Sequence, residues 1–253
     1  MKIALIGYGK MGKTIEEIAL SRGHEITEKI DINLPGSYDS EGFKAADVVI
    51  EFTTPKSAFG NYQKCFERGK AVVSGTTGWL EHLPEVKTAC QDGKNTFFYS
   101  SNYSLGVNIF AEINRQLAKL MNKFGEYAPA MTETHHIHKL DAPSGTAISL
   151  AEGIIDNMDR IDGWKLDRTI FTAGDKPTEV ANENIAADQL PITSLRTGEV
   201  PGIHTIKYDS ADDFIEITHS AKSRRGLAFG VVLAAEFTLG KKGFFTMKDM
   251  LGF

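Results

Sequence analysis

The chain opens with a buried apolar strand that leads directly into a glycine-rich turn and a helix, an order that few folds accommodate. Residues 2–6 read as the strand, Gly7-Tyr8-Gly9-Lys10-Met11-Gly12 interrupts it, and residues 11–22 have helical spacing of apolar side chains. This is a G-x-G-x-x-G pattern in the strand-to-helix context of a dinucleotide-binding turn. Gly7 permits the tight turn, Gly9 lets the backbone approach a pyrophosphate, and Gly12 lets the helix pack on the strand. A plain glycine-rich turn without a ligand is the alternative.

Short apolar strands then alternate with helices. Strands are expected at 25–32, 47–52, 71–74 and 95–99, with a helix at 56–69 between two of them. This alternation predicts parallel βαβ units and an α/β fold with a Rossmann-type doubly wound sheet. Ligands of such sheets bind beyond the carboxyl ends of the strands, where polar loops follow here. The predicted cofactor-binding residues are therefore Gly7, Tyr8, Gly9, Lys10, Met11, Gly12, Asp31, Phe52, Thr53, Gly75, Thr76, Thr77, Ser100, Ser101, Asn102 and Tyr103.

Two residues give opposite indications about which dinucleotide binds. Asp31 ends the second strand, where an acid bonds the adenosine ribose hydroxyls and favours NAD. Lys10 lies inside the glycine turn, where a cation would neutralise the 2′-phosphate of NADP. We expect NADH to be used and NADPH to be accepted too.

The pattern changes after Ser104. A long amphipathic helix fits 105–122, 129–138 looks extended, and 146–157 looks helical. Strands are expected at 168–172, 192–196, 204–208 and 214–218, followed by helices at 225–239 and 246–251. We therefore expect two domains, a dinucleotide-binding domain of residues 1–104 and 224–253 and an α+β substrate and oligomerisation domain of residues 105–223 with a mixed or antiparallel sheet.

Charge and cysteine content limit the classes of function. The net charge of −5 implies no broad basic face for nucleic acid, so a small ligand is expected. No apolar run reaches the roughly 18 residues of a membrane span, and no signal peptide is recognisable. Cys65 and Cys90 form neither a disulfide framework nor a metal-ligand spacing, which favours a reducing, cytoplasmic location.

The densest chemistry lies between Glu133 and Ala147, which reads ETHHIHKLDAPSGTA. Three of the seven histidines fall within four positions, and Lys139 follows them. Ser144 is a good N-cap for the next helix, whose exposed N–H groups at Gly145 and Thr146 would hold a carboxylate. A self-contained cap is the commoner explanation of Pro-Ser-Gly-Thr when that sequence is taken alone. Histidine titrates near neutrality and suits general acid–base catalysis, and Lys139 is expected to hold a carboxylate or to donate a proton.

A metal site is the alternative for the histidines. If 133–138 is a strand, His136 and His138 share one face while His135 points away. No cysteine or further histidine stands at the usual zinc-site spacing, so no metal is expected.

The stretch from Glu133 to Ala147 resembles the signature E-x-H-H-x-x-K-x-D-A-P-S-G-T-A of the dihydrodipicolinate reductases, also described as 4-hydroxy-tetrahydrodipicolinate reductases. The family's Met-Gly ending of the glycine turn, its Gly-Thr-Thr-Gly loop and its Asn-(Phe/Tyr)-Ser motif are similar to 10–12, 75–78 and 102–104 here. Its later R-x-G-x-x-x-G-x-H pattern is similar to the sequence from Arg196 to His204. Glu51 departs from the family's common Asp, and the chain is somewhat short.

The resemblance implies a role for each matching residue. His135 would be the catalytic acid or base, Lys139 a proton donor or substrate cation, and His136, Gly145 and Thr146 would bind a substrate carboxylate. The hydroxyl of Ser144 at the helix start is expected to bind the substrate with them. The loops 75–77 and 100–103 would contact the cofactor. The family is usually a homotetramer joined through the substrate-domain sheets.

The implied reaction is the NAD(P)H-dependent reduction of a small dicarboxylate ring compound, 4-hydroxy-tetrahydrodipicolinate, in the diaminopimelate route of lysine biosynthesis. Two alternatives stay open, another two-domain NAD(P) oxidoreductase such as an amino-acid dehydrogenase, and a non-catalytic NADH-sensing module. Fold alone does not separate them.

Overall fold

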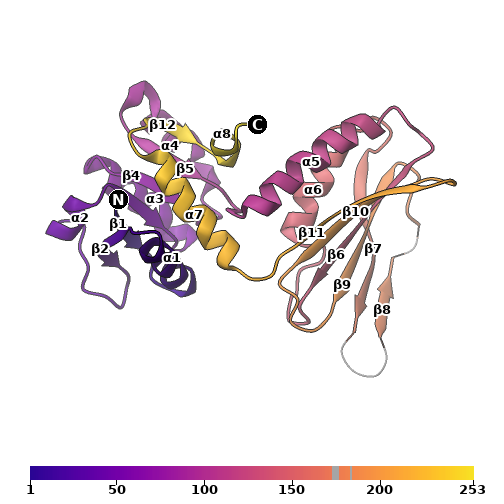
Figure 1. Ribbon diagram of the computed structural model, residues 1–253, viewed down its shortest axis with the longest axis horizontal. Coiled ribbons are helices and arrows are strands. Elements are labelled where there is room, and N and C mark those ends of the chain that lie inside the picture. The colour runs from indigo at the N-terminus through magenta and orange to yellow at the C-terminus, as the bar shows by residue number, and fades with distance from the viewer. Residues whose placement is uncertain (173–176, 183) are drawn as a thin grey trace. The chain divides into compact units, whose positions relative to one another are not determined.

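The computed structural model describes residues 1–172, 177–182 and 184–253, and this part of the chain divides into two compact units (Figure 1). Unit 1 comprises Met1–Asn108 and Arg225–Phe253, and unit 2 comprises Ile109–Arg224. Sequence patterns put the boundaries at 104/105 and 223/224. The first structural boundary instead falls inside the helix α5 (Leu105–Met121), whose first turn belongs to unit 1.

Unit 1 is built on a parallel sheet, as predicted. Its strands among the described residues are β1 (Lys2–Ile6), β2 (Glu25–Ile30), β3 (Val48–Glu51), β4 (Ala71–Ser74), β5 (Thr96–Tyr99) and β12 (Gly243–Phe245), in the order β12-β5-β4-β3-β1-β2. Every neighbouring pair is parallel. The central strands are apolar on both faces because helices cover both faces of a parallel sheet. The pattern therefore reflects the doubly wound fold.

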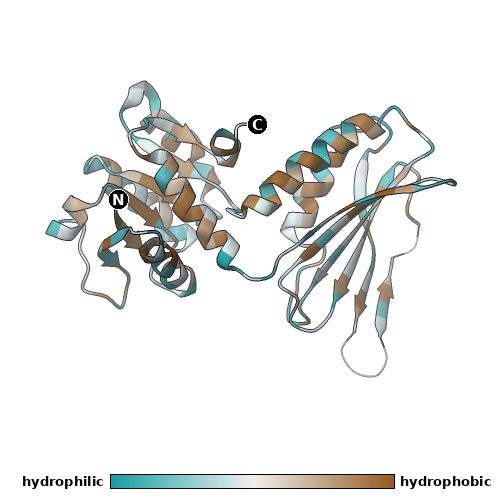
Figure 2. Ribbon diagram, in the orientation of Figure 1, coloured by the Kyte–Doolittle hydropathy of each residue, from teal (hydrophilic) through white to brown (hydrophobic). Residues whose placement is uncertain are grey.

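The helices of unit 1 are α1 (Lys10–Ser21), α2 (Glu41–Ala45), α3 (Pro55–Glu67), α4 (Leu83–Ala89), α7 (Arg225–Thr238) and α8 (Met247–Leu251). The helix α7 returns from the far end of the sequence and is largely apolar in Figure 2. Its side chains at Ala228, Val231 and Val232 join β1, β3 and α1 in one buried cluster. The C-terminal segment that contains α7 is thus part of the doubly wound fold of unit 1.

Unit 2 packs two helices on a mixed sheet. The helices are α5 and α6 (Gly145–Ile155), and the strands are β6 (Ala128–His135), β7 (Gly163–Phe171), β8 (Thr178–Ala181), β9 (Gln189–Arg196), β10 (Ile203–Asp209) and β11 (Phe214–Ser220). The order is β11-β10-β6-β9-β7-β8, with β6, β9 and β7 mutually parallel and the remaining pairs antiparallel. Both helices lie on the same face of the sheet in Figure 1, and their apolar sides bury the alternate residues of β6, β9 and β10.

The expectation of extended chain from 129 to 138 is wrong for its last residues. The strand β6 ends at His135, and residues 136–139 turn. The turn is held by hydrogen bonds from the N–H of Ile137 to the carbonyl of Gly198 and from the N–H of Lys139 to the carbonyl of His136. His136 and His138 therefore do not share a strand face.

Both cysteines are buried in one cluster of unit 1 that also contains Tyr62, Trp79 and Phe97. Burial raises the pKa of the Cys65 thiol to about 12 and that of Cys90 to about 11.

No helix in the described ranges is long and apolar enough to cross a membrane.

Candidate active site

The glycine turn of unit 1 has the geometry that a pyrophosphate site needs. Gly7 has φ +89°, and a side chain there would overlap the carbonyl of Phe52. A Cβ at Gly12 would overlap the carbonyl of Gly7, so only glycine lets α1 start this close to β1. Gly9, by contrast, faces open space. The turn therefore presents bare backbone and the N-terminus of α1 to a free volume, which fits an anionic phosphate.

Two cavities of unit 1 open at the carboxyl ends of its strands. One, of about 290 Å³, is lined by Gly9–Gly12, Phe52, Thr53, Pro55 and Gly75–Thr77. The other, of about 570 Å³, is lined by Ile6, Gly7, Gly9, Ile30–Ile32, Tyr38, Phe52–Thr54, Ser57 and Asn61. Phe52 and Thr53 border both, so the two volumes are adjacent. Together they offer room for the two halves of a dinucleotide.

Asp31 borders the larger cavity and also fixes the glycine turn. Its Oδ2 accepts a hydrogen bond from the N–H of Tyr8 at 2.7 Å. The Tyr8 side chain turns to Glu16 and lies under the ammonium of Lys29, which pairs with Glu16 at 2.6 Å. Tyr8 thus contributes its backbone to the turn and lines neither cavity, while Lys29 is held by a carboxylate.

The loop 100–103 lies outside both cavities. Tyr103 is buried in the core of unit 1, where its hydroxyl donates to the carbonyl of Ser74 at 2.6 Å. Ser100 accepts from the N–H of Asn102 at 3.1 Å, which closes the loop on itself, and Ser101 is exposed. That this loop contacts a cofactor stays a prediction.

A buried carboxylate supports the cavity wall. Glu51 accepts hydrogen bonds from Ser74 at 2.8 Å and from the hydroxyl of Thr53. The N–H of Thr53 in turn donates to the hydroxyl of Thr76 at 2.8 Å. Glu51, which replaces the family's Asp, therefore lies behind Thr53 and Thr76, two of the residues expected to contact the cofactor.

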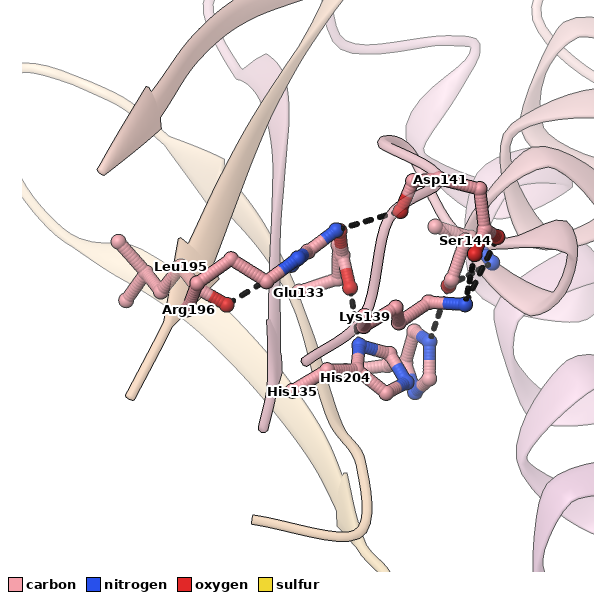
Figure 3. A network of polar contacts seen from close by, with 9 residues as sticks. Glu133, His135, Lys139, Asp141, Ser144, Leu195, Arg196 and His204 are labelled. Atoms are coloured by element: carbon pink, nitrogen blue, oxygen red, sulfur yellow. Dashed lines mark hydrogen bonds and ion pairs between the residues drawn. The ribbon is translucent and has the colours of Figure 1, made fainter. Parts of the chain in front are cut away.

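In unit 2 the end of β6 carries a buried polar cluster (Figure 3). The Nδ1 of His135 is hydrogen-bonded to Oε2 of Glu133, and Oε1 of Glu133 accepts from Nη2 of Arg196 at 2.8 Å. Glu133 is 0% exposed and Arg196 1%. Burial opposes ionisation of Glu133, but the hydrogen bonds from His135 and Arg196 outweigh it and lower the pKa of this carboxyl to about 2. Glu133 is therefore a carboxylate at neutral pH.

A second histidine closes the cluster from β10. The ring of His204 lies edge-on to that of His135, with centroids 5.3 Å apart, and its Nε2 contacts Oγ of Ser144 at 3.1 Å. Burial, assisted by the neighbouring His135, lowers the pKa of His204 to about 4. His204 is accordingly neutral near pH 7 and links the strand cluster to the start of α6.

Lys139 and His136 lie on the turn beyond the strand. The ammonium of Lys139 contacts both carboxylate oxygens of Asp141 at 2.7 Å, which lowers the pKa of Asp141. Nδ1 of His136 is buried and has no hydrogen-bond partner among the described residues. The turn thus holds a cation and an unused imidazole nitrogen close to the His135 cluster.

The helix α6 starts beside them. Ser144 is its N-cap, as predicted, and accepts from the N–H of Ala147 at 3.2 Å. The N–H groups of Gly145 and Thr146 are in the first turn, where helix geometry leaves them without an intrahelical acceptor. Unit 2 therefore brings an imidazole, an ammonium and an anion-ready helix end together, all from residues 133–146.

The spacing of Glu133, His135 and His204 would also admit a metal ion, since one ligand atom of each lies within 4.8 Å of the others. Both oxygens of Glu133 are, however, bonded to His135 and Arg196, and the guanidinium adds a positive charge where an ion would bind. The donor set fits proton transfer better than metal binding.

Sequence reasoning assigned no role to Glu133, Arg196, Gly202 or His204. The signal for Glu133 was available, because residues two apart on a strand share a face, which puts it beside His135. Arg196 lies on β9, Gly202 in the loop before β10, and His204 on β10. Only strand pairing brings these residues to the site.

A glycine turn on a doubly wound sheet, joined to a mixed-sheet unit with an acid–base cluster, defines a two-domain oxidoreductase of the nicotinamide-dependent type. Family models described as the N-terminus and C-terminus of dihydrodipicolinate reductase match residues 1–103 and 106–251. The chain belongs to the dihydrodipicolinate reductase family.

Individual relatives agree. The 4-hydroxy-tetrahydrodipicolinate reductase of Christiangramia forsetii is 46% identical over 251 residues, covering 99% of this chain and 98% of the relative. That of Archaeoglobus fulgidus is 34% identical, covering 99% and 100%. A dipicolinate-bound dihydrodipicolinate reductase from Paenisporosarcina sp. TG-14 has the same fold, with a TM-score of 0.73, 22% identity and 97% of each chain covered.

Proposed function

We propose that this protein uses NAD(P)H to reduce 4-hydroxy-tetrahydrodipicolinate to tetrahydrodipicolinate, in the diaminopimelate route to lysine. The observation that carries the proposal is the cluster in unit 2, where His135, Lys139 and the start of α6 suit a doubly charged ring. The full-length similarity to reductases of this name supports the same substrate.

Each residue of the site would have a distinct role in substrate binding or proton transfer. Lys139 and the N–H groups of Gly145 and Thr146 bind the carboxylates of the substrate, helped by Ser144 and His136. The bound nicotinamide supplies the hydride. His135 supplies the proton to the neighbouring ring carbon, so that the ring gains one hydride and one proton. Orientation and electrostatics are the main contributions of the protein.

The activity is tested by following NADH oxidation, with substrate generated in situ by the preceding synthase. His135→Ala is expected to lower kcat by about 10²–10³-fold with unchanged NADH affinity, because only the proton donor is lost. Lys139→Ala is expected to raise KM and to lower kcat. Near-normal turnover in both variants would defeat the assignment, and a wild-type chain that binds NADH but never oxidises it would favour the sensing module.

We propose that NADH is preferred and that NADPH is also accepted. The carboxylate of Asp31 lines the larger cavity and would repel a 2′-phosphate, and Lys29 is already paired with Glu16. Lys10 lines the smaller cavity and offers partial compensation. The ratio of kcat/KM for the two coenzymes is the measurement, and a preference for NADPH above about 100-fold, roughly 2.7 kcal/mol, would contradict the role of Asp31.

We further propose a homotetramer, assembled through the sheets of unit 2 and acting in the cytoplasm. No helix of the described residues covers the second face of this sheet, and Phe214 on the edge strand β11 is 59% exposed. Light scattering after gel filtration should give four chains for the wild type and fewer for Phe214→Asp. A monomeric wild type at micromolar concentration would contradict the proposal.

A further inference from the structure

We propose that Glu133 and Arg196 are positioning residues for the proton transfer, with Glu133 keeping a proton on Nδ1 of His135 so that Nε2 is the nitrogen that exchanges a proton with substrate. The inference rests on the proposed function, because it takes His135 as the acid or base.

Strand pairing fixes the relative positions of the four side chains. Glu133 and His135 alternate onto the same face of β6. In register, His135 pairs with Arg196 of β9, and Glu133 pairs with His204 of β10. Three adjacent strands therefore hold the cluster, and none of these residues depends on a loop for its place. A site on strands keeps its geometry better than one on loops.

Hydrogen bonding determines which nitrogen of His135 is available. The Glu133 carboxylate accepts only, so the Nδ1 that contacts it must carry the proton. The other nitrogen, Nε2, faces Gly202, where a Cβ would come within 3.0 Å of it. When Nε2 gives its proton to a substrate carbon, the N–H bond breaks and a C–H bond forms. The ring becomes neutral with its Nδ1 proton in place, and solvent returns the second proton.

Charge gives Glu133 and Arg196 opposite effects on His135. With a neutral imidazole the buried Glu133–Arg196 pair has no net charge, and with an imidazolium the cluster has one positive charge. The neutral His204 lies edge-on to the ring. Lys139, itself paired with Asp141, and His219 both lie close enough to His204 to contribute to its lowered pKa. Loss of the carboxylate leaves the guanidinium beside His135 and disfavours the imidazolium, whereas loss of the guanidinium favours it.

The pH dependence of kcat/KM tests these opposite effects. Glu133→Gln is expected to move the pH profile of kcat/KM to lower pH and to lower kcat about tenfold or more. Arg196→Met should move the profile to higher pH, and Arg196→Lys should restore it toward the wild-type position. Glu199→Gln is the matched control, because Glu199 pairs with the exposed His138 at 3.1 Å, and it should change neither quantity.

The nitrogen chemical shifts of the wild-type holoprotein provide a test that needs no variant to fold. Neutral His135 should carry its proton on Nδ1, and a proton on Nε2 would overturn the inference. A Glu133→Gln protein that folds and keeps the wild-type pH profile would also overturn it. If His135→Ala itself retains full activity, the proposed function fails instead, so the two failures are distinguishable.

Discussion

Gly202 determines how much room the imidazole of His135 has. Its φ is +154°, and a Cβ there would lie 3.0 Å from Nε2 of His135. Gly202→Ala is therefore expected to destabilise the protein by about 1–3 kcal/mol and to lower kcat more than tenfold, through backbone strain and a displaced ring. Urea unfolding and steady-state kinetics measure both.

Gly163→Ala is the control, because nothing lies within 4 Å of a Cβ at Gly163. It should leave kcat unchanged. If Gly202→Ala behaves like this control, the ring does not depend on the space beside it.

His204 gives unit 2 a pH-dependent stability. Its pKa is about 4 in the folded protein and 6.5 as the ordinary value, so the unfolded chain binds more protons between these pH values. Stability should fall as the pH drops through this window, by about 2 kcal/mol between pH 7 and pH 5. The Glu133 carboxyl, with a pKa of about 2, changes the stability only below about pH 4.5.

Urea unfolding at pH 7 and pH 5 measures the effect of His204. His204→Gln should flatten the pH dependence, and His138→Gln, which changes an exposed histidine, should not. An equally steep decrease in the His204→Gln variant would contradict the assignment.

At the scale of single elements, a substitution at the N-terminus of α6 can weaken substrate binding without changing the stability of the helix. Gly145 is the first helical residue, a position that accepts proline, and Ser144 at ψ 152° already has the conformation that precedes proline. Gly145→Pro removes one N–H and leaves the helix intact, so KM for the substrate should rise about tenfold with an unchanged melting temperature.

Gly145→Ala is the matched control, since it keeps the N–H and a Cβ meets nothing within 4 Å. It should keep the wild-type KM. Equal KM values for the two variants would remove this N–H from the substrate site.

The packing of α7 on unit 1 depends on one close approach. A Cβ at Gly230 would overlap the carbonyl of Tyr103, whereas a Cβ at Gly226 in the same helix meets nothing within 4 Å. Gly230→Ala should cost at least about 2 kcal/mol through overpacking. Gly226→Ala should leave the stability unchanged or raise it by up to about 1 kcal/mol. Urea midpoints compare them, and similar midpoints would contradict the packing role.

The elements that sequence patterns predicted are those with a strong period or a long apolar run. The strand–turn–helix opening, α3, α5 and the strands β9 to β11 follow from residue spacing. The helix α2 and the strands β8 and β12 were missed, because each is five residues or shorter and too short to display a period. β12 needs its partner β5 to be recognised at all.

For the molecule as a whole, each unit contains one of the two tryptophans, Trp79 in unit 1 and Trp164 in unit 2. In a Trp164→Phe background, Trp79 fluorescence follows the unfolding of unit 1. ADP-ribose at 100 times its Kd should raise the free energy of this unfolding by about 2.7 kcal/mol. AMP, which lacks the pyrophosphate, should raise it less at the same concentration. An unshifted Trp79 transition at saturating ADP-ribose would remove the nucleotide site from unit 1.

The sequence predicted the parts of the site that are contiguous and missed the parts that sheet pairing assembles. His135, Lys139 and Ser144 fall within ten or so positions, where cap and titration chemistry can be read directly. Glu133 shares a strand face with His135 two positions away, but its second partner Arg196 reaches it at 2.8 Å from a strand more than sixty positions away. Strand order is a property of the folded molecule, and the local pattern does not contain it.

The burial of Cys65 and Cys90 makes the native chain a ready background for site-directed labelling. With pKa values of about 12 and 11, neither thiol forms a reactive thiolate at pH 7, when maleimide reagents are used. A cysteine introduced on the surface of each unit would then be the preferred target without removal of either native one. A fluorophore attached in this way would report on the labelled unit alone during turnover.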